Sequence, residues 1–166
     1  MVTRYNFKLT NPHPQRLIVR DCVKRACTLA SEINYNDIAI MLNRFKKETG
    51  ARKFNTDDNW RQFIIKVLLG RDLGNMQYVN EGHRFKVWEF AEKRAKKAIV
   101  QVSKHVVAID GKGHYLDTWD SGEKSIYKAY SIPEYETIVE HIKKNYPKLC
   151  KGLSLERYRG RFTLHL

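Results

Sequence analysis

The chain has 166 residues, 42 % of them hydrophobic and 11 % aromatic, which suits one folded domain with its own core and argues against disorder. No apolar run approaches the roughly 20 residues of a membrane-spanning helix, and the start of the chain lacks the apolar core of a signal peptide. Without a signal-peptide core, a protein of the cytosol is expected. The formal net charge of +13 favours a polyanionic partner.

The first half of the chain is predicted to be helical, after a turn-rich segment at residues 11–14. Apolar residues then recur at helical spacing in three windows. The windows are 21–31, a stretch from Asn34 or Asn36 to a C′ position at Gly50, and a stretch from an N-cap at Thr56 to Gly70. Residues 71–84 have no such pattern and are expected to form a loop.

The second half begins with a short basic helix at 87–97 and continues as strands. Four strands are predicted, at residues 98–102, 105–109, 114–119 and 125–132, and the turn residues 110–113 join the second strand to the third. A helix at 134–145 follows Pro133, and residues 155–166 are a candidate final strand. Helices followed by an antiparallel meander indicate an α+β fold.

Three cysteines are present, an odd number without a CxxC pair, so neither a disulfide framework nor a structural zinc site is expected. Cys22 lies at the start of the first predicted helix, where the partial positive charge favours a thiolate. Cys27 falls on the apolar stripe of the same helix and is expected in the core, and Cys150 has no evident partner. Cys22 is therefore the candidate nucleophile.

A thiolate nucleophile needs a neighbouring base, and the base needs an orienting group. His105 begins the second predicted strand, and Asp117 lies on the third, across the tight turn. In one of the registers that this turn allows, Asp117 lies beside His105. A carboxylate there would fix the tautomer of the imidazole and stabilise its charged form. Cys22, His105 and Asp117 are thus the predicted catalytic residues.

The order of these residues resembles that of papain-like cysteine peptidases, above all compact phage and bacterial members such as bacteriocin-leader peptidases and cell-wall endopeptidases. The resemblance covers about residues 11–132 and lies in the segments Arg20–Ala26, His105–Gly111 and Tyr115–Asp120. It implies a papain-like fold with N-terminal helices packed on an antiparallel β-sheet. Residues 1–134 would be the catalytic domain, and residues 135–166 a basic appendage of a helix and a strand.

The same resemblance implies hydrolysis or transfer at an amide or isopeptide bond through a Cys22 thioester, with no cofactor and no metal. The substrate would be a protein or peptide, with a peptidoglycan stem peptide as the rival, and a phage-encoded chain would act in the host cytoplasm. The oxyanion hole would combine the Cys22 backbone N–H with an upstream side-chain amide. Gln15, seven residues before Cys22, and Asn11 are the candidates for that amide.

Other assignments stay open. His114 is a rival base at the hairpin, and Asp120 is a rival orienting residue, although Asp120-Ser121-Gly122 is typical of a turn. A zinc site of His105, His114 and Asp117 is a further alternative, but no HExxH or CxxC pattern supports it. The sequence also has neither a P-loop nor a GxGxxG motif, the usual signs of nucleotide binding. Trp119 is expected to pack near the site.

A basic binding module that keeps the fold without catalysis is the alternative function, with nucleic acid or a host protein as the partner. Basic residues are unevenly distributed, because residues 101–134 hold four Lys and Arg against five Asp and Glu while the rest of the chain is positive. The predicted triad strands therefore lie in the stretch that is not positive. The candidate polyanion contacts are Lys96, Lys97, Lys143, Lys144, Arg157, Arg159 and Arg161.

Overall fold

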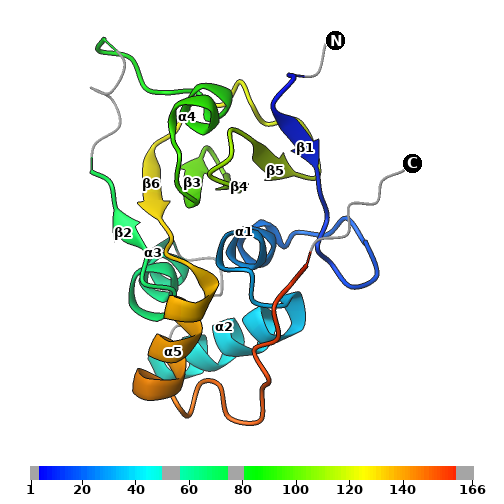
Figure 1. Ribbon diagram of the computed structural model, residues 1–166, viewed down its shortest axis with the longest axis vertical. Coiled ribbons are helices and arrows are strands. Elements are labelled where there is room, and N and C mark those ends of the chain that lie inside the picture. The colour runs from blue at the N-terminus through cyan, green and yellow to red at the C-terminus, as the bar shows by residue number, and fades with distance from the viewer. Residues whose placement is uncertain (1–3, 50–56, 75–80, 160–166) are drawn as a thin grey trace.

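The computed structural model describes residues 4–49, 57–74 and 81–159, and these residues form an α+β fold (Figure 1). Within them, five α-helices accompany one six-stranded sheet. Three sequence predictions fall outside the described residues: the helix end at Gly50, the N-cap at Thr56 and the polyanion contact at Arg161.

The strands form a mixed sheet in the order β1-β5-β4-β3-β6-β2. Their bounds are β1 (Phe7–Leu9), β2 (Arg71–Asp72), β3 (Ala98–Val102), β4 (His105–Ile109), β5 (Tyr115–Asp117) and β6 (Lys128–Ser131). Strands β2 to β6 pair antiparallel, as expected from the sequence. The sheet as a whole is mixed because β1 pairs with β5 in parallel, with Leu9 opposite Asp117.

The helical elements are α1 (Cys22–Ser31), α2 (Tyr35–Thr49), α3 (Asp57–Gln62), the π-helical turn η1 (Phe63–Val67), α4 (Val87–Lys93) and α5 (Tyr135–Asn145). Helix α4 ends earlier than the basic pattern predicted, because Arg94 adopts an extended backbone. The segment expected to be a loop contributes the short edge strand β2. The last strand was predicted at residues 155–166, and its described part makes one isolated bridge, between Ile33 and Arg157.

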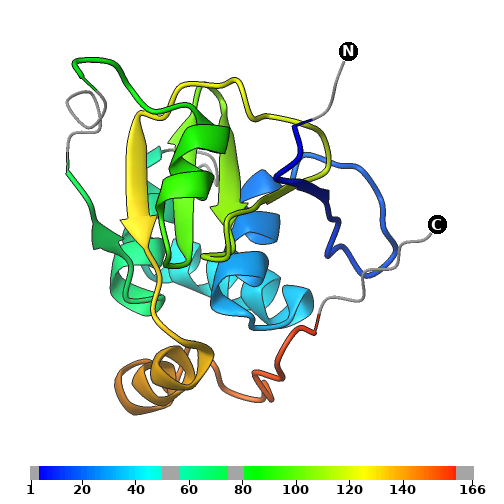
Figure 2. The same cartoon turned by 45° about the horizontal axis from the view of Figure 1, so that its top comes forward.

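Apolar clusters cover both faces of the sheet. Cys27 of α1 packs with residues of α2, η1 and α5 on one face, whereas Phe90 belongs to a second cluster that α4 forms with the sheet. Successive residues of β4 alternate between the two clusters, with Val106 in the first and Val107 in the second. Figure 2 shows α4 on one side of the strands and α1 and α2 on the other.

The C-terminal segment shares the core of the preceding chain. Ile138 and Ile142 of α5, together with Leu149 and Leu155, are buried in the cluster that contains Cys27. The division at residue 134 stays a prediction. None of the helices in the described ranges is long and apolar enough to cross a membrane.

Candidate active site

Three elements bring the predicted triad to one end of the sheet. Cys22 is the first residue of α1, His105 is the first residue of β4, and Asp117 is the last residue of β5. Helix α1 packs along β4, and β4 pairs with β5. His105 follows a tight turn in which it pairs with Val102 and in which Lys104 has a φ of 55°. The nucleophile, the base and the orienting carboxylate predicted from the sequence therefore meet.

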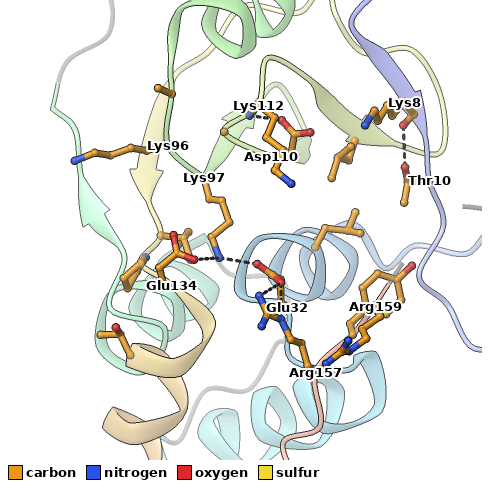
Figure 3. Close-up of a pocket in the computed structure, with 18 residues that line it drawn as sticks. Lys8, Thr10, Glu32, Lys96, Lys97, Asp110, Lys112, Glu134, Arg157 and Arg159 are labelled. Atoms are coloured by element: carbon orange, nitrogen blue, oxygen red, sulfur yellow. Dashed lines mark hydrogen bonds and ion pairs between the residues drawn. The ribbon is translucent and has the colours of Figure 1, made fainter. Parts of the chain in front are cut away.

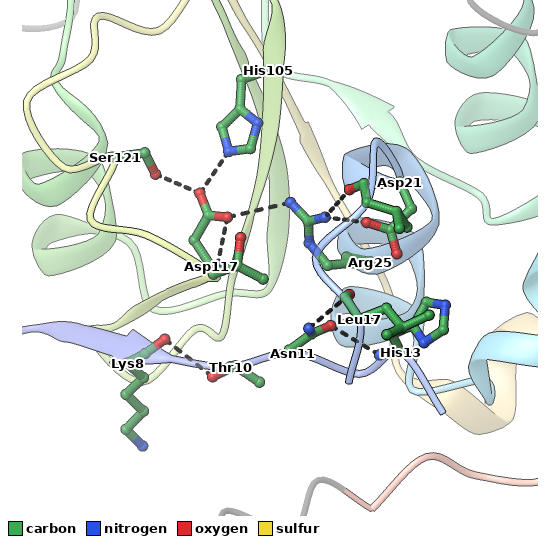
Figure 4. A network of polar contacts seen from close by, with 12 residues as sticks. Lys8, Thr10, Asn11, His13, Leu17, Asp21, Arg25, His105, Asp117 and Ser121 are labelled. Carbon is green, nitrogen blue, oxygen red and sulfur yellow. Dashed lines mark hydrogen bonds and ion pairs between the residues drawn. The ribbon is translucent and has the colours of Figure 1, made fainter. Parts of the chain in front are cut away.

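His105 and Asp117 are in direct contact. Nε2 of His105 lies 2.6 Å from Oδ2 of Asp117, as Figure 4 shows. The His105 side chain is 10 % exposed and that of Asp117 is 2 % exposed, so little water competes for this contact. A carboxylate accepts hydrogen bonds, so the ring proton on Nε2 faces Asp117 and Nδ1 is the nitrogen left for another partner.

Cys22 lines the same cavity as His105 and is a second group that raises the pKa of its ring. Burial lowers the pKa of His105, but hydrogen bonds with Asp117 and then with Cys22, together with the negative charges of both groups, outweigh burial and raise the pKa to about 9. The imidazole is therefore charged near neutral pH. A protonated imidazole beside a thiol favours the thiolate, which is the reactive form of cysteine.

Asp117 is held from several directions. Oδ2 also accepts a hydrogen bond from Ser121 Oγ at 2.7 Å, and Oδ1 accepts one from the backbone N–H of Thr118 at 2.8 Å. The parallel strand β1 continues this support, because the backbone N–H of Thr10 donates to the carbonyl of Asp117 at 2.8 Å. These contacts fix the carboxylate in the position that orients His105.

A buried arginine links the triad to the loop before α1. Nη2 of Arg25 lies 3.6 Å from Oδ1 of Asp117, and Nη1 forms a hydrogen-bonded ion pair with Asp21 (Figure 4). The second oxygen of Asp21 accepts a hydrogen bond from the Tyr35 hydroxyl at 2.7 Å, and burial followed by this bond raises the pKa of Tyr35. Asp21 precedes α1 without capping it through its side chain, because its carboxylate serves this network instead.

A cavity of about 810 Å³ opens beside two of the three triad residues, because Cys22 and His105 are part of its lining. Its apolar wall includes Ile18, Val19 and Trp119, which are 80 %, 47 % and 44 % exposed. The Trp119 ring packs against the His105 ring with the centroids 5.0 Å apart, in agreement with the packing role expected for it. Exposed apolar side chains beside a buried polar site are typical of a substrate cleft.

The candidate oxyanion amides are placed differently from the triad. Gln15 is exposed and Asn11 is half-buried, and neither residue lines this cavity. The Asn11 amide donates to the carbonyl of Leu17 at 3.0 Å, and its oxygen accepts from the backbone N–H of His13 at 3.1 Å. In this structure Asn11 braces the loop that leads to Cys22.

The rival residues have other partners. Nδ1 of His114 lies 2.9 Å from Asp110, at the far end of β4 from Cys22. Asp120 accepts hydrogen bonds from the Tyr115 hydroxyl and from the backbone N–H of Gly122, which fits the turn predicted for it.

Burial raises the pKa of Cys27, so this thiol is kept protonated in the core. Among the described residues, no group of three or more His, Cys, Asp or Glu is arranged to hold a metal ion.

The predicted polyanion contacts do not form one cluster. Lys96, Lys97, Arg157 and Arg159 line a second cavity, which Figure 3 shows. Two of these residues are ion-paired there, because Lys97 and Arg157 both bind Glu32. Lys143 and Lys144 are exposed in the last turn of α5 and are not part of that lining.

Sequence reasoning missed Arg25, Tyr35 and Ser121 as supports of the site. The available signal was a basic residue four positions after Asp21 on the apolar side of a helix, where a charge must find a partner. Ser121 had no comparable signal, because its role depends on the path of the loop after β5.

Comparisons of the chain with protein-family models, with curated proteins and with solved structures found no match.

Proposed function

We propose that the chain is a cysteine-dependent hydrolase or transferase of the papain-like type, acting on an amide or isopeptide bond of a protein or peptide. The observation that carries the proposal is the His105 ring, which contacts the buried Asp117 carboxylate and lines one cavity with Cys22, a group that raises its pKa. A nucleophile at a helix start, a base beside it and an orienting group behind the base are the parts that acyl transfer requires.

The reaction would begin with attack of the Cys22 thiolate on the carbonyl carbon of the scissile bond. The protonated His105 then gives a proton to the leaving amine, and a thioester remains on Cys22. Water, or the amine of an acceptor, then attacks the thioester carbonyl and gives up a proton to His105. The C–S bond breaks, which releases the carboxylic acid or the new amide and restores the Cys22 thiolate beside the protonated His105. The backbone N–H of Cys22 at the start of α1 is suited to stabilise the oxyanion.

The cleft supports a peptide substrate with an apolar side chain close to the scissile bond. Ile18, Val19 and Trp119 offer exposed apolar surface within the cavity that holds Cys22. Burial of such a side chain contributes roughly 1.5–3 kcal/mol and would hold the carbonyl next to the thiolate.

Incubation with a mixture of synthetic peptides, followed by mass spectrometry of the products, tests the proposal. The wild-type chain should release products or form a covalent acyl adduct on Cys22, whereas Cys22→Ala and His105→Ala should do neither. Cys150→Ala is the matched control, because it also removes a partly exposed thiol but lies outside the cleft. Cleavage that survives in Cys22→Ala, or its absence from all the proteins under all conditions tested, would contradict the proposal.

A further inference from the structure

A second cavity, of about 900 Å³, lies at the opposite ends of the elements that hold the triad. Cys22 begins α1, whereas Leu29 and Glu32 at the other end of that helix line this space. His105 begins β4, whereas Asp110, just after the end of β4, is part of the same wall. The two cavities have no lining residue in common, so a ligand in one leaves the other accessible.

The walls of this second cavity carry more basic than acidic side chains. Six are basic: Lys8, Lys96, Lys97, Lys112, Arg157 and Arg159. Three are acidic: Glu32, Asp110 and Glu134. The excess positive charge is therefore built into one concave space, where it acts on a ligand more strongly than the same charge spread over a flat surface.

Two of the three acidic side chains, Glu32 and Asp110, are engaged in holding the walls together, and the exposed Glu134 lies 3.9 Å from Lys97. Glu32 binds Lys97 at 3.0 Å and Arg157 at 2.7 Å (Figure 3). Burial raises the pKa of Glu32, but these two partners outweigh burial and lower the pKa, so the carboxylate stays ionised. Asp110 accepts hydrogen bonds from the backbone N–H groups of Lys112 and His114.

Four cations remain after these pairs are formed: Lys8, Lys96, Lys112 and Arg159. All four are exposed, and in the described part of the chain none has a carboxylate within ion-pair distance. They come from β1, the segment before β3, the turn after β4 and the C-terminal segment. Figure 3 shows Lys8 and Lys96 on opposite sides of the space. One carboxylate could not neutralise cations on so many walls.

We propose that this cavity binds a ligand with several phosphate groups, either consecutive phosphates of a single-stranded nucleic acid or the polyphosphate of a nucleotide. Phosphate oxygens accept hydrogen bonds from Lys and Arg in several directions, and linked phosphates place successive charges close together. Each side chain of an acidic peptide brings a single carboxylate, whereas each phosphate can accept hydrogen bonds from cations on more than one wall. The site is independent of the chemistry at Cys22.

Fluorescence anisotropy with a labelled 12-nucleotide single strand tests the proposal, with unlabelled nucleoside triphosphate and polyglutamate as competitors. Lys8→Ala with Lys112→Ala removes two cations of the cavity. Lys143→Ala with Lys144→Ala removes the same charge from an exposed surface outside it and is the matched control. Both pairs are exposed, and a melting curve verifies that each double variant is folded.

The cavity variant should bind the strand, or the triphosphate if that is the tighter ligand, about tenfold more weakly. For the labelled single-stranded nucleic acid, the negative slope of log affinity against log salt should also become shallower, by about 0.7 for each lost phosphate contact. The control should change affinity by less than about twofold, and Cys22→Ala should bind as the wild type does. Equal losses in both double variants, equal competition by polyglutamate, or binding of neither phosphate ligand would overturn the proposal.

Discussion

At the residue scale, Arg25 determines whether the site can exist in a buried environment. Its guanidinium is 7 % exposed and lies between the carboxylates of Asp21 and Asp117, which are 4 % and 2 % exposed. Without Arg25, the buried Asp21 carboxylate would have no cationic partner and Asp117 would keep only His105, although burial of a charge demands such compensation. In the proposed reaction, Arg25 would therefore act through Asp117 as a positioning residue.

Arg25→Ala should lower the free energy of unfolding by about 3–5 kcal/mol, because it leaves the buried Asp21 carboxylate without its ion-pair partner and removes one of the two cations beside Asp117. Urea unfolding at pH 7 measures this change. Lys151→Ala is the control, since Lys151 is exposed and a surface substitution shifts stability by about 0.5 kcal/mol or less. A loss below about 1 kcal/mol in Arg25→Ala would show that the network contributes little to the fold.

His105 gives the site a pH dependence with a definite sign. The pKa of His105 is raised from 6.5 to about 9, chiefly by Asp117 and Cys22 against the effect of burial. A raised pKa means that the stabilisation is complete below pH 6.5, the unfolded value, and is lost as the pH rises through about 9. Between these values the wild-type chain should lose stability relative to His105→Gln.

NMR titration of the His105 ring measures the pKa directly. The wild type should titrate near pH 9, and Cys22→Ala should titrate lower because one of the groups that raises the pKa is gone. The same value in both proteins would mean that Cys22 does not interact with the ring.

The sequence was sufficient to predict that Cys22, His105 and Asp117 lie together, but not which residues support them. A cysteine at a helix start and a histidine and an aspartate on hairpin-linked strands are short-range features, and their meeting follows from one turn and one helix packing. Asn11 and Gln15 were chosen by position in the chain alone. The loop at 11–17 folds back on itself through the Asn11–Leu17 hydrogen bond, and its sequence has no periodic pattern from which this conformation could be predicted.

At the element scale, the turn between β4 and β5 sets the register that places Asp117 beside His105. Gly111 in this turn has a φ of +77°, and a Cβ there would lie 2.8 Å from the backbone of Lys96 and Lys97. Gly113 has a φ of +99°, but a Cβ there would meet nothing within 4 Å. The two glycines therefore share the backbone requirement and differ in the space around them.

Gly111→Ala should destabilise the chain more than Gly113→Ala does. Each substitution costs about 1–2 kcal/mol for its positive φ, and Gly111→Ala adds a backbone clash of about 1 kcal/mol or more. Urea denaturation of the two variants checks this difference. Equal losses would indicate that the backbone of Lys96 and Lys97 moves away without cost.

Strands β1 and β2 could not be predicted from the sequence pattern. The long strands β3 and β4 have nearly continuous burial and were predicted from their apolar residues. Strand β1 has three residues and β2 has two, so neither is long enough to show a period. Both are defined by distant partners, β5 and β6, which only the folded sheet supplies.

At the scale of the whole molecule, the C-terminal segment shares one core with α1, the helix that begins at Cys22. Ile142 of α5 is fully buried in the cluster that includes Cys27 of α1. This arrangement predicts a single cooperative unfolding transition, in which Ile142→Ala lowers the free energy of unfolding by about 2–5 kcal/mol. Circular dichroism and tryptophan fluorescence should follow the same urea curve. Two separate transitions would instead support an appendage that begins near residue 135.

The central claim is that Cys22 is a nucleophile activated by His105, and site-resolved alkylation tests it most directly. Limited treatment with iodoacetamide near pH 6, followed by peptide mass analysis, gives a rate for each of the three thiols. Cys22 should react first, because the charged imidazole stabilises its thiolate, and this lead over Cys150 should disappear in His105→Ala. Faster labelling of Cys27 or Cys150 in the wild type, or an unchanged Cys22 rate in His105→Ala, would contradict the account.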